Sequence, residues 1–331
     1  MVAIFSALLI FGDLQEVTIQ PFDFQIENQP ETYIRGTWAL YEEKGFLYFI
    51  PKGDPYVFKI DPKTKTFEKI GGRGSGPGEL GTSQPWCLSL HDDGLWVLDH
   101  HRGRASFFVK GVYQTSFKVK SYQIYQGYQP KFGFAHSDQF VVIPAYPASG
   151  HLANVYDYSG EIVTKMGEIL PMDRERLQWN PALNNTIWCY WGEQWYCLFI
   201  YRPTIRIFDK HFELEKEITI VGPEVDLYEA RFQKMEEEPM IKSVRPHFTD
   251  FQVTDTKLMV MCDGVLYQMD HGGNLISRIG FYGNQELIEA FGHRTRVHFD
   301  HAVVMDSGQV YLGMVGSGFF DHDLWVADLP K

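Results

Sequence analysis

The feature that most constrains this chain is a pattern of short apolar runs separated by turn residues. It is clearest where residues 86–90, 95–98 and 105–109 follow a glycine-rich bend. Each run has the length of a strand and is rich in Trp, Val, Leu and Phe, which favour β structure. Because turns rich in Asp, His and Gly separate the runs, they are predicted to form antiparallel strands.

The same segment carries a resemblance to a known family. The residues concerned are Gly74-Ser75-Gly76-Pro77-Gly78-Glu79-Leu80, then Pro85, then Gly94-Leu95-Trp96-Val97-Leu98-Asp99, then Arg104 and Phe108. In this order they resemble one repeat of the NHL type, which implies a six-bladed β-propeller of the kind common among exported bacterial proteins. One position departs from the repeat, since the Asn often found three residues after the Asp is Arg102 here. The match is specific for fold, and it implies that Asp99 and Arg104 have a structural role.

A strand pattern of this kind recurs along the whole chain. The predicted third strands end at Asp61, Lys110, Asp157, Asp209, Asp270 and Asp328, at intervals of 49, 47, 52, 61 and 58 residues. A lone blade cannot bury both faces of its sheet, so one good repeat predicts others. We therefore expect an all-β chain of six four-stranded antiparallel blades. The sixth unit offers only three strands, and residues 16–20 are expected to supply its fourth, closing the ring.

Domain organisation follows from this count. Residues 13–331 are expected to form a single propeller domain, preceded by an apolar start at residues 1–12. The run VAIFSALLIF is too short to span a bilayer, so no transmembrane segment is expected. It has the length of a signal-peptide core without a basic start or a cleavage site, and a truncated signal and a buried strand both fit it. The family resemblance favours export, to the periplasm or cell surface, with a cytoplasmic location as the alternative.

Charge and cysteine usage exclude some classes of partner and site. The formal net charge of −12 predicts an acidic surface that repels phosphate backbones, so nucleic acid is not an expected partner. The four cysteines show no CxxC spacing, which argues against a zinc–thiolate site. Cys189 and Cys197 flank a predicted hairpin turn. Buried thiols are favoured there over a cross-strand disulfide, which stays open as the alternative.

Two insertions have helical patterns. Residues 224–238 have apolar positions near helical spacing, an acidic start and Pro239 as a stop, and residues 284–292 form a second, weaker candidate. In a propeller, the links between blades emerge on the same face as the loops between second and third strands. Both insertions are therefore expected on one loop-rich face, the natural binding surface of such a scaffold.

Candidate ligand-binding residues lie in the loops of that face. They combine aromatic rings with titratable groups and are His100, His101, Arg102, Tyr146, His151, Phe319, Phe320, Asp321 and His322. Such a mixture suits a polar ligand with apolar edges, such as a peptide, a protein segment or a glycan. The competing interpretation is that these are ordinary solvated loop residues.

Catalytic and cofactor motifs are weak in this chain. Gly76-x-Gly78-x-x-Gly81 fits GxGxxG in form, but Pro77 interrupts it and no βαβ pattern surrounds it. His298-Phe299-Asp300-His301 is the most metal-like cluster, although strand alternation would bring only His298 and Asp300 to one face. With His247 they could hold a divalent metal at the mouth of the channel. Imidazoles hydrogen-bonded at the ring centre are the favoured alternative, so no cofactor is predicted.

Two functional hypotheses remain open from the sequence. The first is a non-enzymatic binding module that presents its loop-rich face to a protein, peptide or glycan. The second is a propeller enzyme, either a metal-assisted hydrolase or lactonase or a lyase, with its site at the central funnel. The fold does not separate them, because one scaffold hosts both.

Overall fold

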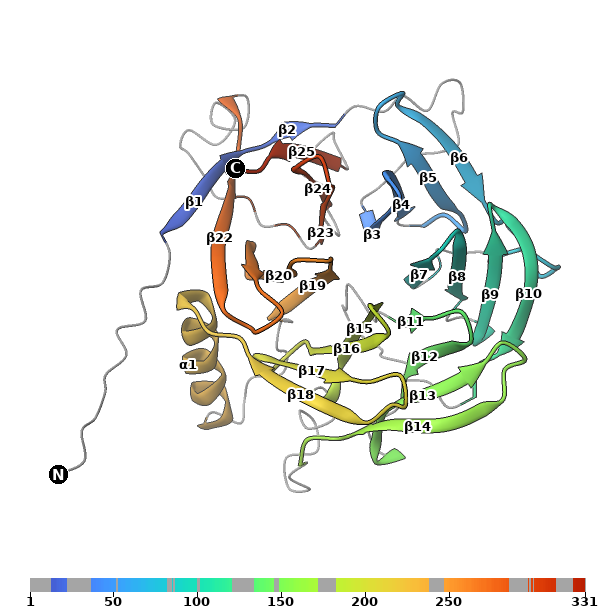
Figure 1. Ribbon diagram of the computed structural model, residues 1–331. Helices are drawn as coiled ribbons and strands as arrows, with labels where there is room; N and C mark the ends of the chain where they lie inside the picture. Colours follow the sequence, from blue (N-terminus) through green and yellow to red (C-terminus); the bar gives the residue numbers. More distant parts are fainter. Residues whose placement is uncertain are drawn as a thin grey trace.

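The computed structural model describes residues 13–22, 37–51, 53–81, 85, 87–99, 102–120, 134–145, 149–171, 183–237, 247–285, 297, 299, 301–313 and 324–330. All strands in these ranges belong to six sheets that are arranged as blades around a central axis (Figure 1). The predicted all-β, six-bladed propeller is confirmed.

The blades follow one another in chain order. The first blade comprises β3 (Thr37–Glu43), β4 (Phe46–Pro51), β5 (Val57–Asp61) and β6 (Thr66–Ile70). The second comprises β7 (Cys87–His91), β8 (Gly94–Asp99), β9 (Arg104–Val109) and β10 (Val112–Lys118). The third comprises β11 (Ala135–His136), β12 (Phe140–Pro144), β13 (His151–Asp157) and β14 (Ile162–Glu168). The fourth comprises β15 (Thr186–Trp191), β16 (Gln194–Phe199), β17 (Thr204–Phe208) and β18 (Leu214–Thr219).

The last two blades also take up the N-terminal strands. The fifth blade comprises β19 (Phe248–Val253), β20 (Leu258–Cys262), β21 (Val265–Met269) and β22 (Leu275–Tyr282), with β1 (Leu14–Thr18) added at its outer edge. The sixth comprises β23 (His301–Val304), β24 (Gln309–Gly313), β25 (Leu324–Asp328) and β2 (Gln20–Pro21). In every blade the first of the consecutive strands lies nearest the axis (Figure 1).

Burial explains why the inner strands read as continuous apolar runs. Every residue of β8, β20 and β21 is buried, because neighbouring blades cover both faces of these strands. The outer strand β18 has one buried residue, Ile218, and is otherwise exposed. Burial thus distinguishes these middle strands of a blade from its outermost strand.

The core is divided into layers between neighbouring blades. The described residues form six apolar clusters, and each cluster joins one blade to the next around the ring. Between the second and third blades, the fully buried Trp96 stacks on Phe107 with ring centroids 4.9 Å apart and meets Tyr158 edge-on at 5.2 Å. Burying an aromatic side chain of this size contributes about 1.5–3 kcal/mol.

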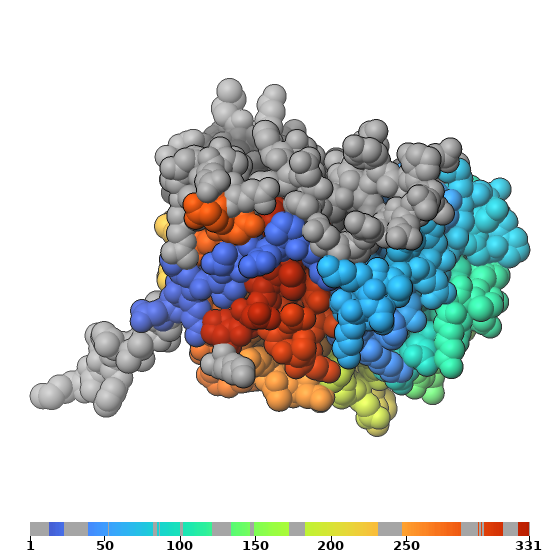
Figure 2. Space-filling model, turned by 90° about the horizontal axis from the view of Figure 1, so that it is seen from above, coloured from blue at the N-terminus to red at the C-terminus, as the bar shows by residue number. Residues whose placement is uncertain are grey.

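The N-terminal segment closes the ring. β1 pairs in parallel with β22 of the fifth blade, and β2 pairs in antiparallel fashion with β25 of the sixth. Two further backbone bonds of 3.0 Å, from Ile19 to Tyr282 and from Phe22 to Leu324, continue the pairing on either side of β2. Figure 2 shows this blue segment lying across the orange and red sheets of the last two blades. The prediction that an N-terminal strand pairs with the last blade is confirmed.

The exact residues of this pairing differ from the expectation. Residues 16–20 were expected to complete the sixth blade, whereas β1 extends the fifth and only Gln20–Pro21 pairs with the sixth. The alternation of residues 16–20 identified a strand but not the register of its partner. Because the segment crosses between the two blades at Ile19, both Val17 and Ile19 are buried in the apolar layer that these blades share.

Helix α1 (Pro223–Glu237) confirms the first predicted helix. The Glu224 carboxylate pairs with the Arg278 guanidinium at 2.6 Å and accepts a hydrogen bond of 2.5 Å from the Tyr267 hydroxyl. These two contacts fix the helix to the fifth blade. Burial alone would raise the pKa of Glu224, but the hydrogen bonds from Arg278 and Tyr267 outweigh it and lower that pKa. The second candidate, residues 284–292, falls almost wholly outside the described residues. No helix in the described part of the chain is long and apolar enough to cross a membrane.

The four cysteines are free thiols, which confirms the favoured interpretation. Cys197 pairs in register with Trp188, and Cys189 with Tyr196, so the two cysteines lie on opposite faces of the fourth blade. Cys197 is buried in the layer shared with the third blade, and the Cys189 thiol contacts the Phe251 carbonyl of the fifth at 3.4 Å. A bond between them is excluded by this geometry.

Ile19→Ala tests the closure. Ile19 is completely buried, so the substitution should lower the free energy of unfolding by about 2–4 kcal/mol in urea denaturation. Val163→Ala, on the exposed face of an outer strand, is the matched control and should be nearly neutral, since Val163 is 48% exposed. Equal effects of the two substitutions would show that the N-terminal segment does not stabilise the ring.

Candidate functional site

The two faces of the ring are built from different connections. One face, which we call the turn face, carries the first-to-second turns at 44–45, 92–93, 137–139, 192–193, 254–257 and 305–308, and the third-to-fourth turns. The opposite face, which we call the loop face, carries the second-to-third connections and the links between blades. The described parts of those links are residues 22, 71–81, 85, 119–120, 134, 169–171, 183–185, 220–237, 247, 283–285, 297 and 299.

Most predicted site residues lie outside the described ranges. These are His100, His101, Tyr146, Phe319, Phe320, Asp321 and His322, together with His298 and Asp300 of the metal alternative. Arg102, His151 and His247 are described. The structure therefore describes three of the predicted residues individually, and the set as a whole stays a prediction.

All three described residues make contacts within the fold. The Arg102 Nε lies 3.7 Å from the Asp99 carboxylate, and the Arg102 backbone N–H donates to the same side chain at 3.3 Å. His151 is buried, with Nε2 2.8 Å from Asn154 Oδ1. His247 is also buried.

The His247 ring is held by side chains from two elements of the fifth-blade region. It stacks on the Tyr228 ring of α1 with centroids 3.8 Å apart, and its Nε2 lies 3.3 Å from the Cys262 thiol. This imidazole is therefore part of the packing between helix and blade.

The glycine-rich bend is stabilised by its own side chains. The Glu79 carboxylate accepts the Gly76 N–H, and a side chain at Gly74, where φ is 145°, would collide with that carboxylate. Arg104 donates to the carbonyls of Ser75, Gly76 and Glu79. A glycine-rich turn can hold an anion with its amides. Here the Glu79 carboxylate occupies the place of such an anion. This agrees with the sequence argument against a dinucleotide site and with a structural role for Arg104.

A buried imidazole–carboxylate pair lies on the innermost strands of the last two blades. His301 Nδ1 is 3.5 Å from Asp250 Oδ2, and both side chains are almost completely buried. Asp250 also accepts the backbone N–H of Phe251 at 2.7 Å and of Ala302 at 3.1 Å. Such pairs can serve acid–base chemistry. In this arrangement the carboxylate joins strand β19 to strand β23.

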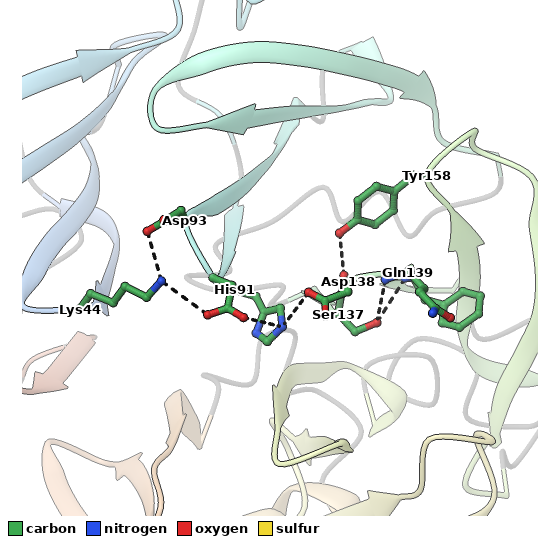
Figure 3. Close-up of polar contacts among 9 residues, drawn as sticks. Lys44, His91, Asp93, Ser137, Asp138, Gln139 and Tyr158 are labelled. Carbon is green, nitrogen blue, oxygen red and sulfur yellow. Dashed lines mark hydrogen bonds and ion pairs between the residues drawn. The ribbon is translucent and has the colours of Figure 1, made fainter.

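The turn face carries an ionic chain that the sequence analysis did not identify (Figure 3). Lys44 Nζ lies 3.2 Å from Asp93 and 3.5 Å from Asp92, and His91 Nε2 lies 3.9 Å from Asp92 and 3.3 Å from Asp138. Asp92 and Asp138 are 70% and 80% exposed, so each contact contributes little to stability. The ligand atoms of His91, Asp92 and Asp138 lie within 4.8 Å of one another, where a divalent cation could bind, but Lys44 already neutralises part of this charge.

The repeat itself contains the signal that locates these residues. They come from equivalent first-to-second turns of the first three blades, and equivalent turns of a propeller meet at the same rim. A search for contiguous motifs misses such a group. Tyr158 fixes the third of these turns, because its hydroxyl donates to the Ser137 carbonyl at 2.6 Å.

Behind His91 lies a buried neutral histidine. Ser89 Oγ accepts the His136 backbone N–H at 3.1 Å and forms a hydrogen bond of 2.8 Å with His136 Nδ1. Burial lowers the pKa of His136 to about 3, and the neighbouring His91 contributes to this lowering. The imidazole is therefore uncharged in the folded protein at neutral pH.

A groove of about 480 Å³ opens on the turn face between the fourth and fifth blades. It is lined by Trp191, Gly192, Gln194, Tyr196, Ile207, Glu215, Lys216, Asp255 and His271. The Tyr196 hydroxyl lies 3.0 Å from Gln194 Oε1 and 3.4 Å from His271 Nδ1, and His271 Nε2 donates to the Thr254 carbonyl at 2.9 Å. Aromatic and polar groups of two blades thus form fixed walls.

Comparisons with known proteins support the fold and leave the family open. No protein-family model matches the sequence, and no curated protein matches it either. Solved structures do match, but at sequence identities of 9–10%, which shows a shared fold alone. The NHL resemblance is therefore confirmed as far as the six-bladed propeller and stays a prediction beyond it.

Three of these structures cover nearly the whole chain. A protein of Bacteroides fragilis that is proposed to be exported superposes with a TM-score of 0.56 at 10% identity, over 95% of this chain and 96% of that one. A streptogramin B lyase gives 0.52 at 10% identity, over 94% and 97%. A catalytically inactive virginiamycin B lyase of Staphylococcus aureus, solved with quinupristin, gives 0.52 at 9% identity, over 95% and 100%.

The pH dependence of stability tests the neutral His136. Its folded-state pKa of about 3 lies below the unfolded value, so the unfolded chain takes up a proton first and stability is lost as pH falls from about 6.5 towards 3. His136→Asn removes this contribution. Between pH 7 and pH 5.5, urea denaturation should show the unmodified protein losing about 1.3 kcal/mol more than the variant. The same loss in both proteins would mean that the imidazole is not held neutral.

Proposed function

We propose that this chain is a binding propeller whose loop face takes a protein, a peptide or a glycan. The observation that carries the proposal is the difference between the two faces. The turns of one face are short, whereas the links of the other include residues 169–185 and 220–247, and the latter contains α1. A rigid ring that presents long and varied connections on one side is the usual form of a binding scaffold.

The site proposed on this face consists of the nine loop residues named from the sequence, at 100–102, 146, 151 and 319–322. Arg102 and His151 would form its base, because Arg102 contacts Asp99 at the end of β8 and His151, the first residue of β13, contacts Asn154 of the same strand. The compartment proposed with it is the periplasm or the cell surface, and the ring of residues 13–331 is proposed to be one domain.

An enzymatic function at the central funnel is the competing proposal. It requires His247, His298 and Asp300 to converge on a metal. The described member, His247, is buried between Tyr228 and Cys262, and this packing favours the binding proposal.

A peptide and glycan array tests the binding proposal directly. The double variant His100→Ala/His101→Ala should lose most of the signal of the unmodified protein, since it removes two aromatic, titratable groups from the proposed surface. His211→Ala, in an exposed third-to-fourth turn on the turn face, is the matched control and should keep the signal. An unchanged signal from the double variant would remove these loops from the site.

Metal analysis separates the two proposals. Under the binding proposal, the purified protein holds no stoichiometric ion that depends on His298 and Asp300, so His298→Ala/Asp300→Ala should leave metal content and melting temperature unchanged. Loss of one equivalent of a divalent ion in that variant would instead support the funnel enzyme.

A further inference from the structure

The turn face gathers carboxylates from every blade. Each first-to-second turn, or the strand residue next to it, contributes at least one of Glu43, Asp92, Asp93, Asp138, Glu193, Asp255 and Asp306. Equivalent turns of a propeller meet at the inner rim, so residues far apart in sequence share one electrostatic field. Carboxylates of all six blades therefore lie along one rim.

Two titratable groups on this rim have raised pKa values. The pKa of Tyr190 is raised, mainly by burial and then by Glu193 and Asp138, which come from the turns of two different blades. The pKa of Glu43 is raised by burial, against the effect of Lys44. Two lysines of this face pair with carboxylates, because Lys44 lies close to Asp92 and Asp93 and Lys210 Nζ lies 3.4 Å from Glu193. Lys257, in the fifth-blade turn, donates to Gln268 Oε1 at 2.9 Å.

The groove between the fourth and fifth blades adds a shaped site to this charge. Trp191 is 40% exposed at its edge, and Tyr196 forms its wall. Glu215 is oriented by a hydrogen bond from Gln194, and no hydrogen bond reaches the exposed Asp255 carboxylate from the described residues. An aromatic surface beside two carboxylates is the arrangement that binds a guanidinium or an ammonium group.

The one lysine that lines the groove among the described residues does not neutralise these carboxylates directly. Lys216 Nζ donates to the carbonyls of His271 at 3.1 Å and Gly272 at 3.3 Å, so its ammonium joins the two blades. The groove therefore presents two carboxylates, Glu215 and Asp255, next to aromatic rings.

We propose that the turn face binds a basic segment of a partner protein, with an arginine side chain seated in the groove between Trp191, Glu215 and Asp255. The guanidinium stacks on the indole and pairs with the carboxylates, which an arginine can do at once through its planar fork. Further basic residues of the segment pair with carboxylates along the rim. This surface is separate from the loop face, so the proposal stands beside the proposed function.

Fluorescence polarisation with a labelled Gly-Arg-Gly-Arg-Gly peptide tests the proposal. The peptide should bind at about 25 mM salt, bind more weakly at about 300 mM because exposed charges are screened, and bind better than its Lys counterpart. A Glu counterpart should not bind. No binding of the Arg peptide at low salt, or equal binding of the Arg and Lys peptides, would overturn the proposal.

Matched double variants separate the groove from general attraction. Glu215→Gln/Asp255→Asn and Asp138→Asn/Asp306→Asn remove the same charge from the same face, but only the first changes the groove. The first double variant should lower the affinity for the Arg peptide about tenfold and the second about twofold. Trp191→Ala should lower this affinity about fivefold. Equal losses in the two double variants, or no effect of Trp191→Ala, would contradict an anchored arginine.

Two controls keep the result interpretable. The substituted groove side chains are exposed, so each variant should have nearly the melting temperature of the unmodified protein. His100→Ala/His101→Ala should bind the Arg peptide like the unmodified protein. If that variant no longer bound the Arg peptide, the basic segment would bind to the loop face and the turn-face proposal would be wrong.

Discussion

The structure depends on the need of each sheet to bury two apolar faces. A blade such as the second has Val97 on one side and Trp96 on the other, and both side chains are completely buried. No single partner can cover both sides of such a sheet, so each blade requires two neighbours and the series must return to its start. The six apolar layers of the described residues are the physical result, and the N-terminal segment makes the last of them complete.

The same requirement explains how much of the fold could be read from the sequence. Strands buried on both faces give apolar runs without alternation, and a recurring set of turn residues separates them, so the number of blades was predictable. Helix α1 was predictable from its spacing and its proline stop. The partner of β1 was not, because alternation in residues 16–20 identifies a strand while the choice between the edges of β22 and β25 depends on where the chain crosses at Ile19.

The candidate sites were less accessible to sequence reasoning for a related reason. Contiguous motifs such as His298-Phe299-Asp300-His301 attract attention, whereas the groups that the described structure brings together come from separate blades. Lys44, Asp92 and Asp138 meet because they occupy equivalent turns, and Glu215 and Asp255 line one groove although they belong to different blades. Aligning the blades on their first-to-second turns would have revealed the first group. The second also requires the walls formed by Trp191 and Tyr196.

The pairing of β1 with β22 has a consequence for biosynthesis. Leu14–Thr18 leaves the ribosome early, but its partner Leu275–Tyr282 is made much later in translation. Contacts of such long sequence separation form slowly, since a large loop must close before they are gained. Until then the outer edge of β22 has unpaired amides and carbonyls, which can pair with the strands of other nascent chains. Assembly of this ring is therefore most open to aggregation just before its two ends meet.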